Sequence, residues 1–196
     1  MKKFIFPFVI GVALFVTGCN EENDSQTGTK QDELSIIKTY DTDLGKLEAY
    51  YINEEIDEEH EENDIGLKIT SVEYGKITLE ELDGSIYEKI ADEDGKNTYL
   101  KVGVELDADP KAYEKDEITF FIYQATIDVQ GKKMQADSVS SDKVYINNGK
   151  VEEQDKGYLY FIVDATMPIT SLKLNVPAPF KDGSSISDNY EFKIDL

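Results

Sequence analysis

The chain has 196 residues with 20 basic and 41 acidic side chains, a formal net charge of −21, and all of its basic residues are lysine. This negative excess disfavours nucleic-acid binding and a basic patch facing anionic lipid, because it repels polyanions. A single cysteine excludes an intramolecular disulfide, so the fold must depend on its hydrophobic core.

The first feature along the chain is an apolar run, residues 4–16, that follows two lysines. A membrane-spanning helix needs about 20 apolar residues, so this shorter run fits a secretory signal peptide better than a span. The run ends in Val16-Thr17-Gly18-Cys19, which resembles the bacterial lipobox: an aliphatic residue, two small residues and then cysteine.

That resemblance implies that residues 1–18 are removed and that Cys19 becomes the first residue, carrying covalent diacylglycerol and a fatty acid. Several acyl chains anchor a protein firmly, so we expect it at the extracytoplasmic face of a bacterial cell membrane. Residues 19–33 are polar and acidic, which predicts a flexible tether. Residues 1–18 hold two lysines and no acid, so the remaining chain has 18 lysines against 41 acids, or −23.

Residues 34–196 have a length that suits one domain and enough isoleucine, leucine and tyrosine to fold. Residues 46–52 predict a first strand, with Gly45 in the turn before it. The next stretch, residues 54–64, holds eight carboxylates in eleven positions. Repulsion between like charges predicts an exposed loop there.

From residue 66 onward, apolar and polar residues alternate as they do in half-buried strands. The strands that this alternation predicts cover residues 100–106, 121–129, 159–165, 172–176 and 190–196. The second of them ends at a hairpin turn, where Gly131 can adopt a positive φ. The apolar positions change parity between Ile69 and Val72, which indicates a bulge near Thr70. Short strands at about ten-residue spacing predict an all-β sandwich of about seven to nine strands.

Residues 77–90 fit two structures. A helical stripe of leucine and isoleucine, with a capping box made by Thr78 and Glu81, predicts a short helix near residues 78–90. Asp83-Gly84 is instead typical of a two-residue hairpin, and a glycine within a helix costs about 1 kcal/mol. The sequence leaves both interpretations open.

The second half of the chain resembles a known domain. Asp128-Val129-Gln130-Gly131 matches a D-x-x-G hairpin, and Gly157 precedes an apolar strand, residues 158–163. In these features the chain is similar to an Ig-like extracellular domain of many Gram-positive lipoproteins, whose fold is similar to that of the mycobacterial secreted immunoprotective antigen. The resemblance implies an Ig-like β-sandwich, usually without known catalytic function, and it transfers no functional residue.

The sequence offers little support for catalysis. Ser140 and Lys143 fit S-x-x-K, and residues 187–189 fit S-D-N, but penicillin-binding enzymes also need a helix at the serine and a K-T-G strand. The only histidine, His60, has no further histidine or cysteine with which to complete a zinc site. We therefore expect that the protein is not an enzyme.

Asp92, Asp94 and Asn97 form a candidate calcium loop. Aligning this loop with an EF-hand puts Ile90 and Lys101 where carboxylates are required, so an EF-hand is excluded. A looser site that also uses the acidic run is the alternative, and it would make the chain a calcium-responsive extracellular module.

The chain has twelve tyrosines, of which Tyr158 and Tyr160 share one face of a predicted strand, opposite Leu159 and Phe161. The pair is a candidate partner-binding surface, although strands favour tyrosine in any case. We expect a lipid-anchored, non-catalytic binding module whose partners are the membrane, through its anchor, and an envelope protein or polymer. We expect no nucleic-acid partner, and no cofactor beyond the lipid unless calcium binds.

Overall fold

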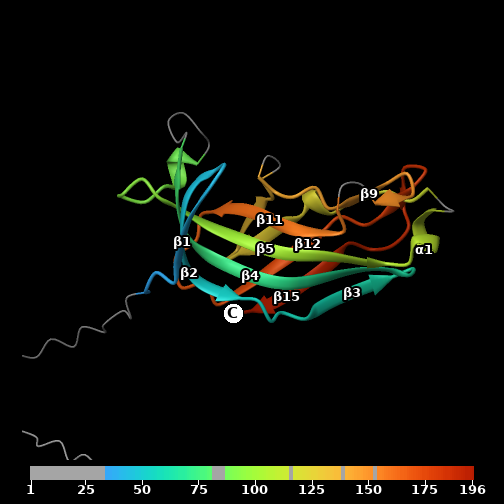
Figure 1. The fold of residues 1–196 in the computed structure, drawn as a ribbon, viewed down its shortest axis with the longest axis horizontal. Helices are drawn as coiled ribbons and strands as arrows, with labels where there is room; N and C mark the ends of the chain where they lie inside the picture. The colour runs from blue at the N-terminus through green and yellow to red at the C-terminus, as the bar shows by residue number, and fades with distance from the viewer. Residues whose placement is uncertain (1–33, 81–86, 115–116, 138–139, 152–153) are drawn as a thin grey trace, which may run out of the picture. The chain divides into compact units, whose positions relative to one another are not determined.

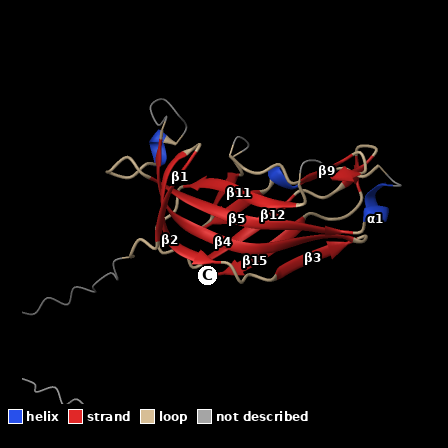
Figure 2. Cartoon of the chain, in the orientation of Figure 1, coloured by secondary structure: helices blue, strands red, loops and turns tan. Residues whose placement is uncertain are grey.

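The computed structural model describes residues 34–80, 87–114, 117–137, 140–151 and 154–196, which build two layers of antiparallel sheet (Figures 1 and 2). Buried side chains from both layers form one large hydrophobic core between them. The predicted all-β sandwich is confirmed. Among the described residues, no helix is both long enough and apolar enough to cross a membrane.

The first layer is a six-stranded sheet in the order β1-β2-β4-β5-β11, in which β3 also pairs with β4. Its longest strand, β4, pairs through its first half with β3 and through its second half with β2. The six strands are β1 (Lys38–Thr42), β2 (Gly45–Asn53), β3 (Glu58–Glu62), β4 (Ile65–Leu79), β5 (Asn97–Ala108) and β11 (Lys156–Val163).

The second layer is a four-stranded sheet in the order β15-β12-β7-β8. Its strands are β15 (Tyr190–Asp195), β12 (Ser171–Val176), β7 (Thr126–Val129) and β8 (Lys132–Gln135). Smaller elements complete the described fold: β6 (Phe120–Phe121), β9 (Tyr145–Asn147), β10 (Lys150–Val151), β13 (Phe180–Lys181), β14 (Ser184–Ser185) and the short helix α1 (Pro110–Glu114). Several strands have only two residues, so the described chain counts more strands than the seven to nine expected.

Most of the predicted strands are present. The alternating stretches near residues 46–52, 100–106 and 172–176 lie in β2, β5 and β12, and those near 159–165 and 190–196 lie in β11 and β15. The expected single strand over residues 121–129 is wrong. A 3₁₀ helix, Ile122–Gln124, divides it into β6 and β7, because each part pairs with a different sheet: β6 with β9, and β7 with β12.

The acidic run is not the exposed loop that its charge predicts. It contains β3, and the His60 ring stacks on the ring of Tyr190 with their centroids 4.5 Å apart. The prediction failed because a strand turns alternate side chains to opposite faces. His60 packs against the second sheet, while most of the carboxylates of β3 stay in solvent, where their repulsion is screened.

The bulge predicted near Thr70 is confirmed. Between β4 and β5, Ile69 lies opposite Val104 and Ser71 lies opposite Gly103, so Thr70 is the extra residue. The shift keeps apolar side chains on the core face on both sides of the bulge, from Ile65 to Ile69 before it and at Val72 and Tyr74 after it.

The hairpin turn predicted at Gly131 is also confirmed: Gln130 and Gly131 have φ of 53° and 80° and join β7 to β8. Asn148-Gly149 and Asp182-Gly183 make further two-residue turns with positive φ at both positions. These dipeptides are the usual chemistry of tight hairpins.

The segment that fitted either a helix or a hairpin extends β4 to Leu79, so the capping box at Thr78 is not formed. Residues 81–86 lie outside the described structure, and Glu88–Ile90 forms a 3₁₀ helix. Tyr87 and Ile90 pack on a small second cluster made by Leu47, Ile77, Tyr99 and Ile162 on the outer face of the first sheet. This cluster lies beside the surface described next.

Candidate functional site

The two tyrosines singled out from the sequence lie on β11, on the face of the first sheet that points away from the main core. Tyr158 lies opposite Gly103 of β5, and Tyr160 lies opposite Lys101. The Tyr158 side chain is 43% exposed, one of three large hydrophobic residues exposed in the described chain, whereas Tyr160 is half-buried. Tyr158 is therefore the accessible member of the pair.

Lys101 is the centre of this surface. Its Nζ lies 4.1 Å from the ring centroid of Tyr158, 5.4 Å from that of Tyr40 and 5.8 Å from that of Tyr160. A cation at such distances from an aromatic ring is attracted to it. The ammonium group therefore supports one face of Tyr158 and holds the ring in place.

Glu73 of β4 lies beneath these rings and is only 7% exposed. Its Oε1 accepts hydrogen bonds from the hydroxyls of Tyr40 and Tyr99, the second at 2.6 Å, and its Oε2 lies 3.9 Å from Lys101 Nζ. Burial, together with the nearby carboxylate, raises the pKa of both hydroxyls well above their usual value. Burial likewise raises the pKa of Tyr160 to about 12, so these tyrosines stay protonated as hydrogen-bond donors.

A groove of about 400 Å³ opens beside Tyr158. Above Gly103, the bulge of β4 brings two hydroxyls together: a Cβ at this glycine would collide with Ser71 Oγ and would lie 2.6 Å from Thr70 Oγ1. A larger residue at this position would force both hydroxyls to move. The groove is lined by Lys38, Ile52, Glu54, Thr70, Ser71, Val72, Glu73, Lys101 and Tyr158.

A second groove, of about 470 Å³, lies on the other side of Tyr158. It runs between the β1–β2 turn and the segment after β8, and it is lined by Thr42, Asp43, Leu44, Ser140, Ser141, Asp142, Tyr158 and Tyr160. Tyr158 thus separates two polar grooves and contributes a wall to each.

Side chains from the segment after β8 cover the outer edge of β11. Ser141 Oγ accepts from the backbone N–H of Tyr160 at 2.9 Å, and Asp142 Oδ2 accepts from that of Tyr158 at 2.7 Å. The backbone under both tyrosines is therefore fixed. The S-x-x-K stretch in this segment has a structural role, because Ser141 and Asp142 take the place of a neighbouring strand.

The predicted calcium residues lie in the loop before β5. Asp92 Oδ1 accepts from the backbone N–H groups of Asp94 and Lys96, and Oδ2 pairs with Lys76 Nζ at 3.0 Å. Asp94 is exposed, and the Asn97 amide is buried and donates to the backbone carbonyl of Tyr87. The Asp92 carboxylate is thus already neutralised. Within the described ranges, no group of three or more histidine, cysteine or acidic side chains is placed to hold a metal ion.

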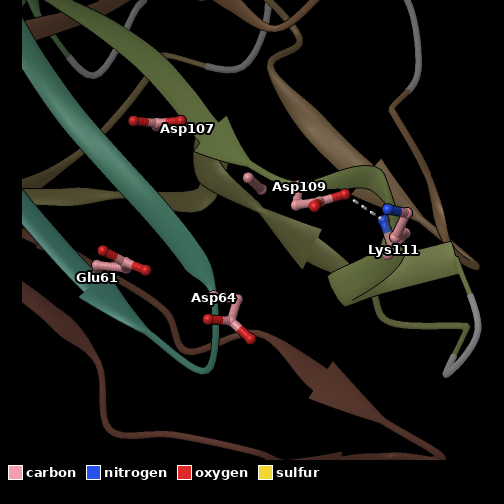
Figure 3. Close-up of a pocket in the computed structure, with 6 residues that line it drawn as sticks. Glu61, Asp64, Asp107, Asp109 and Lys111 are labelled. Atoms are coloured by element: carbon pink, nitrogen blue, oxygen red, sulfur yellow. Dashed lines mark hydrogen bonds between the residues drawn. The ribbon is translucent and has the colours of Figure 1, made fainter.

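An acidic pocket of about 420 Å³ lies at the end of the first sheet where β3, β4 and β5 meet α1 (Figure 3). Asp109 accepts from the backbone N–H of Lys111 at 2.9 Å. Figure 3 shows the acidic side chains of Glu61, Asp64 and Asp107 spread around the pocket and pointing in different directions. The pocket is therefore acidic, but its carboxylates do not converge on one point.

The other residues that the sequence offered as candidates either make structural contacts or precede the part of the chain that the structure describes. The ring of His60, on β3, stacks on the ring of Tyr190, on β15. Ser187 Oγ donates a hydrogen bond to the backbone carbonyl of Asp188. Cys19, the predicted lipidation site, precedes the described residues.

Sequence reasoning missed Lys101, Glu73 and the Thr70–Ser71 hydroxyl pair as parts of the Tyr158 surface. The change of parity indicates the bulge, and Gly103 stands between Val102 and Val104 in a predicted strand. A glycine inside a strand often marks a bulge or a close approach, so the two signals together indicate this place.

Comparisons with known proteins identify a similar fold but no related protein of known activity. No family model matches the chain, and no curated protein matches it. A crystal structure of a functionally unknown protein from Listeria monocytogenes EGD-e is similar to it, with a TM-score of 0.50 and 13% sequence identity over 77% of this chain and 88% of that one. At this identity the likeness concerns the fold alone.

Proposed function

We propose that this chain is a lipid-anchored bacterial lipoprotein of the cell surface that acts as a non-catalytic binding module in the envelope. The lipid is attached at Cys19, residues 19–33 form the tether, and the β-sandwich carries the binding surface. That surface is the outer face of the first sheet around Tyr158, called here the Tyr158 surface: the two grooves and the residues that line them.

The observation that carries the binding part of this proposal is the exposure of Tyr158 between two grooves on a rigid sheet. Tyrosine is enriched at binding surfaces because it offers a large apolar area with a polar end and few rotatable bonds. The network beneath it, built on Lys101 and Glu73, fixes the ring before any partner arrives. Such pre-organisation lowers the entropic cost of binding.

The anchoring part depends on the lipobox-like sequence that ends at Cys19. Its test is metabolic labelling of expressing bacteria with an alkyne-bearing fatty acid. We expect the full chain to be labelled and to fractionate with membranes, while Cys19→Ser loses both properties. Equal labelling of the two chains, or a soluble wild-type chain, contradicts the anchor.

A further inference from the structure

We infer that the Tyr158 surface binds carbohydrate: one sugar ring of an uncharged polysaccharide strand lies on Tyr158, with its hydroxyls over Thr70, Ser71 and Lys101. This inference rests on the proposed binding function and names the class of ligand for the same surface.

The groove beside Tyr158 has unused hydrogen-bonding capacity. Within the described chain, neither the Thr70 nor the Ser71 hydroxyl has a hydrogen-bond partner. The ion pair between Lys101 and Glu73, at 3.9 Å, is too long to be a hydrogen bond. The ammonium group, on a side chain that is 16% exposed, therefore keeps its donors for another acceptor. Half-buried polar groups of this kind require a partner, either water or a ligand.

The polar groups of the groove are arranged in line with the tyrosine ring. Tyr158, Gly103 and Ser71 lie in one row across three neighbouring strands. Strands are spaced about 4.8 Å apart, and both hydroxyls reach over Gly103, so they lie about one strand spacing from the backbone of Tyr158. The hydroxyls of Thr70 and Ser71 lie over Gly103, the residue directly opposite Tyr158. A flat ligand with one apolar face and hydroxyls at its rim matches this row.

The charges that line this groove indicate the class of ligand. The lining of this groove contains two lysines, Lys38 and Lys101, and two glutamates, Glu54 and Glu73, in a chain whose net charge is −21. The groove is thus balanced where the protein as a whole is strongly negative. A balanced site favours an uncharged ligand over a polycation or a polyanion.

The composition of the lining favours a sugar over a protein partner. Protein interfaces are centred on several buried aromatic or aliphatic anchors. Around Tyr158 the lining consists mostly of hydroxyl, carboxylate and ammonium groups, and the other two exposed large hydrophobic residues, Ile36 and Ile37, are not among it. One aromatic platform with a polar surround is better suited to a sugar, whose hydroxyls both donate and accept.

The test is a titration of the full chain, kept in a detergent without a sugar head group, with oligomers of N-acetylglucosamine and of β-linked glucose. Backbone amide shifts are followed by NMR. We expect the largest shifts at Ser71, Gly103 and Tyr158. Tyr158→Ala should weaken binding about tenfold, and Ser71→Ala about fivefold. Tyr158→Phe, which keeps the ring, should bind within about twofold of wild type.

Controls keep the result specific. Lys193→Ala changes an exposed side chain of the second sheet and should bind as the wild type does. The affinity should change little with salt, since the ligand is uncharged. The inference is overturned if neither oligosaccharide shifts these amides, or if Tyr158→Ala binds as tightly as wild type. If sugars fail while a crosslinker at position 158 captures an envelope protein in cells, the inference is refuted and the proposed binding function stands.

Discussion

Removing the Glu73 carboxylate tests whether it organises the Tyr158 surface. Glu73→Ala leaves the hydroxyls of Tyr99, which is fully buried, and of Tyr40 without their acceptor. A buried donor left unsatisfied costs about 1–3 kcal/mol, and Tyr40 lies closer to water, so we expect a total loss of about 3 kcal/mol in the free energy of unfolding. Glu73→Gln keeps an acceptor of the same shape and should lose about 1 kcal/mol, because hydrogen bonds to a charged acceptor are stronger.

Urea denaturation followed by circular dichroism measures these losses, with exposed Glu58→Ala as the control, which should stay within about 0.5 kcal/mol of wild type. A double-mutant cycle of Glu73→Ala with Tyr99→Phe isolates the pair, and we expect a coupling of about 1–2 kcal/mol. A loss below about 1 kcal/mol for Glu73→Ala, or a coupling near zero, would refute the reasoning that the carboxylate holds these hydroxyls.

Four further predictions concern the fold, its pH dependence and its response to calcium. Gly103→Ala forces a methyl group into the bulge hydroxyls and should cost about 1–3 kcal/mol in urea denaturation, and a neutral result would show that the bulge can relax. Lys193 lies directly across from Lys173 on exposed positions, so Lys193→Glu should gain about 0.5 kcal/mol, and a loss in the same assay would contradict this. Burial raises the pKa of Tyr99 in the folded protein, so the Tyr99 hydroxyl of the unfolded chain loses its proton at a lower pH. The contribution of Tyr99 to the free energy of unfolding is therefore full below about pH 10 and falls as the pH rises further. Tyr99→Phe should therefore make the alkaline fall shallower by about 1.4 kcal/mol per pH unit, and an unchanged slope would show that Tyr99 ionises as readily when folded. Calcium at several millimolar should raise the melting temperature no more than magnesium at equal ionic strength, since Asp92 is already paired with lysine; a calcium-specific rise would favour the calcium-responsive alternative.

Local chemistry made much of the sandwich predictable. The strict alternation of apolar and polar residues predicted β5, β12 and β15, and the change of parity after Ile69 predicted the bulge at Thr70. Both signals are local, because a strand shows its two faces within a few residues of its own sequence.

The failures came where tertiary pairing decides. Carboxylate repulsion predicted a loop at the acidic run, yet residues 58–62 form β3, which pairs with β4. Its His60 stacks on Tyr190, which lies far away in the sequence. The stretch from Phe121 to Val129 alternates well enough for one strand, but two different partner strands divide it. No local pattern contains either contact.

The candidate site was predicted in part for the same reason. Alternation placed Tyr158 and Tyr160 on the outer face, since that follows from their own strand. The contribution of Glu73 and Lys101 depends on the register of β4, β5 and β11, which one sequence does not give. The contacts of Lys101 with Tyr40 and Tyr158 can be recognised only once the order and register of their strands are known.

The most direct test of the proposed binding function is site-specific photo-crosslinking in intact bacteria. Tyr158→benzoylphenylalanine places the reactive group between the two grooves, and Lys193→benzoylphenylalanine places it on the exposed face of the second sheet as a matched control. We expect an envelope component, polysaccharide or protein, to be captured through position 158 and not through position 193. Equal capture at both positions, or none at position 158 from a correctly folded and labelled chain, would contradict the account that this surface binds.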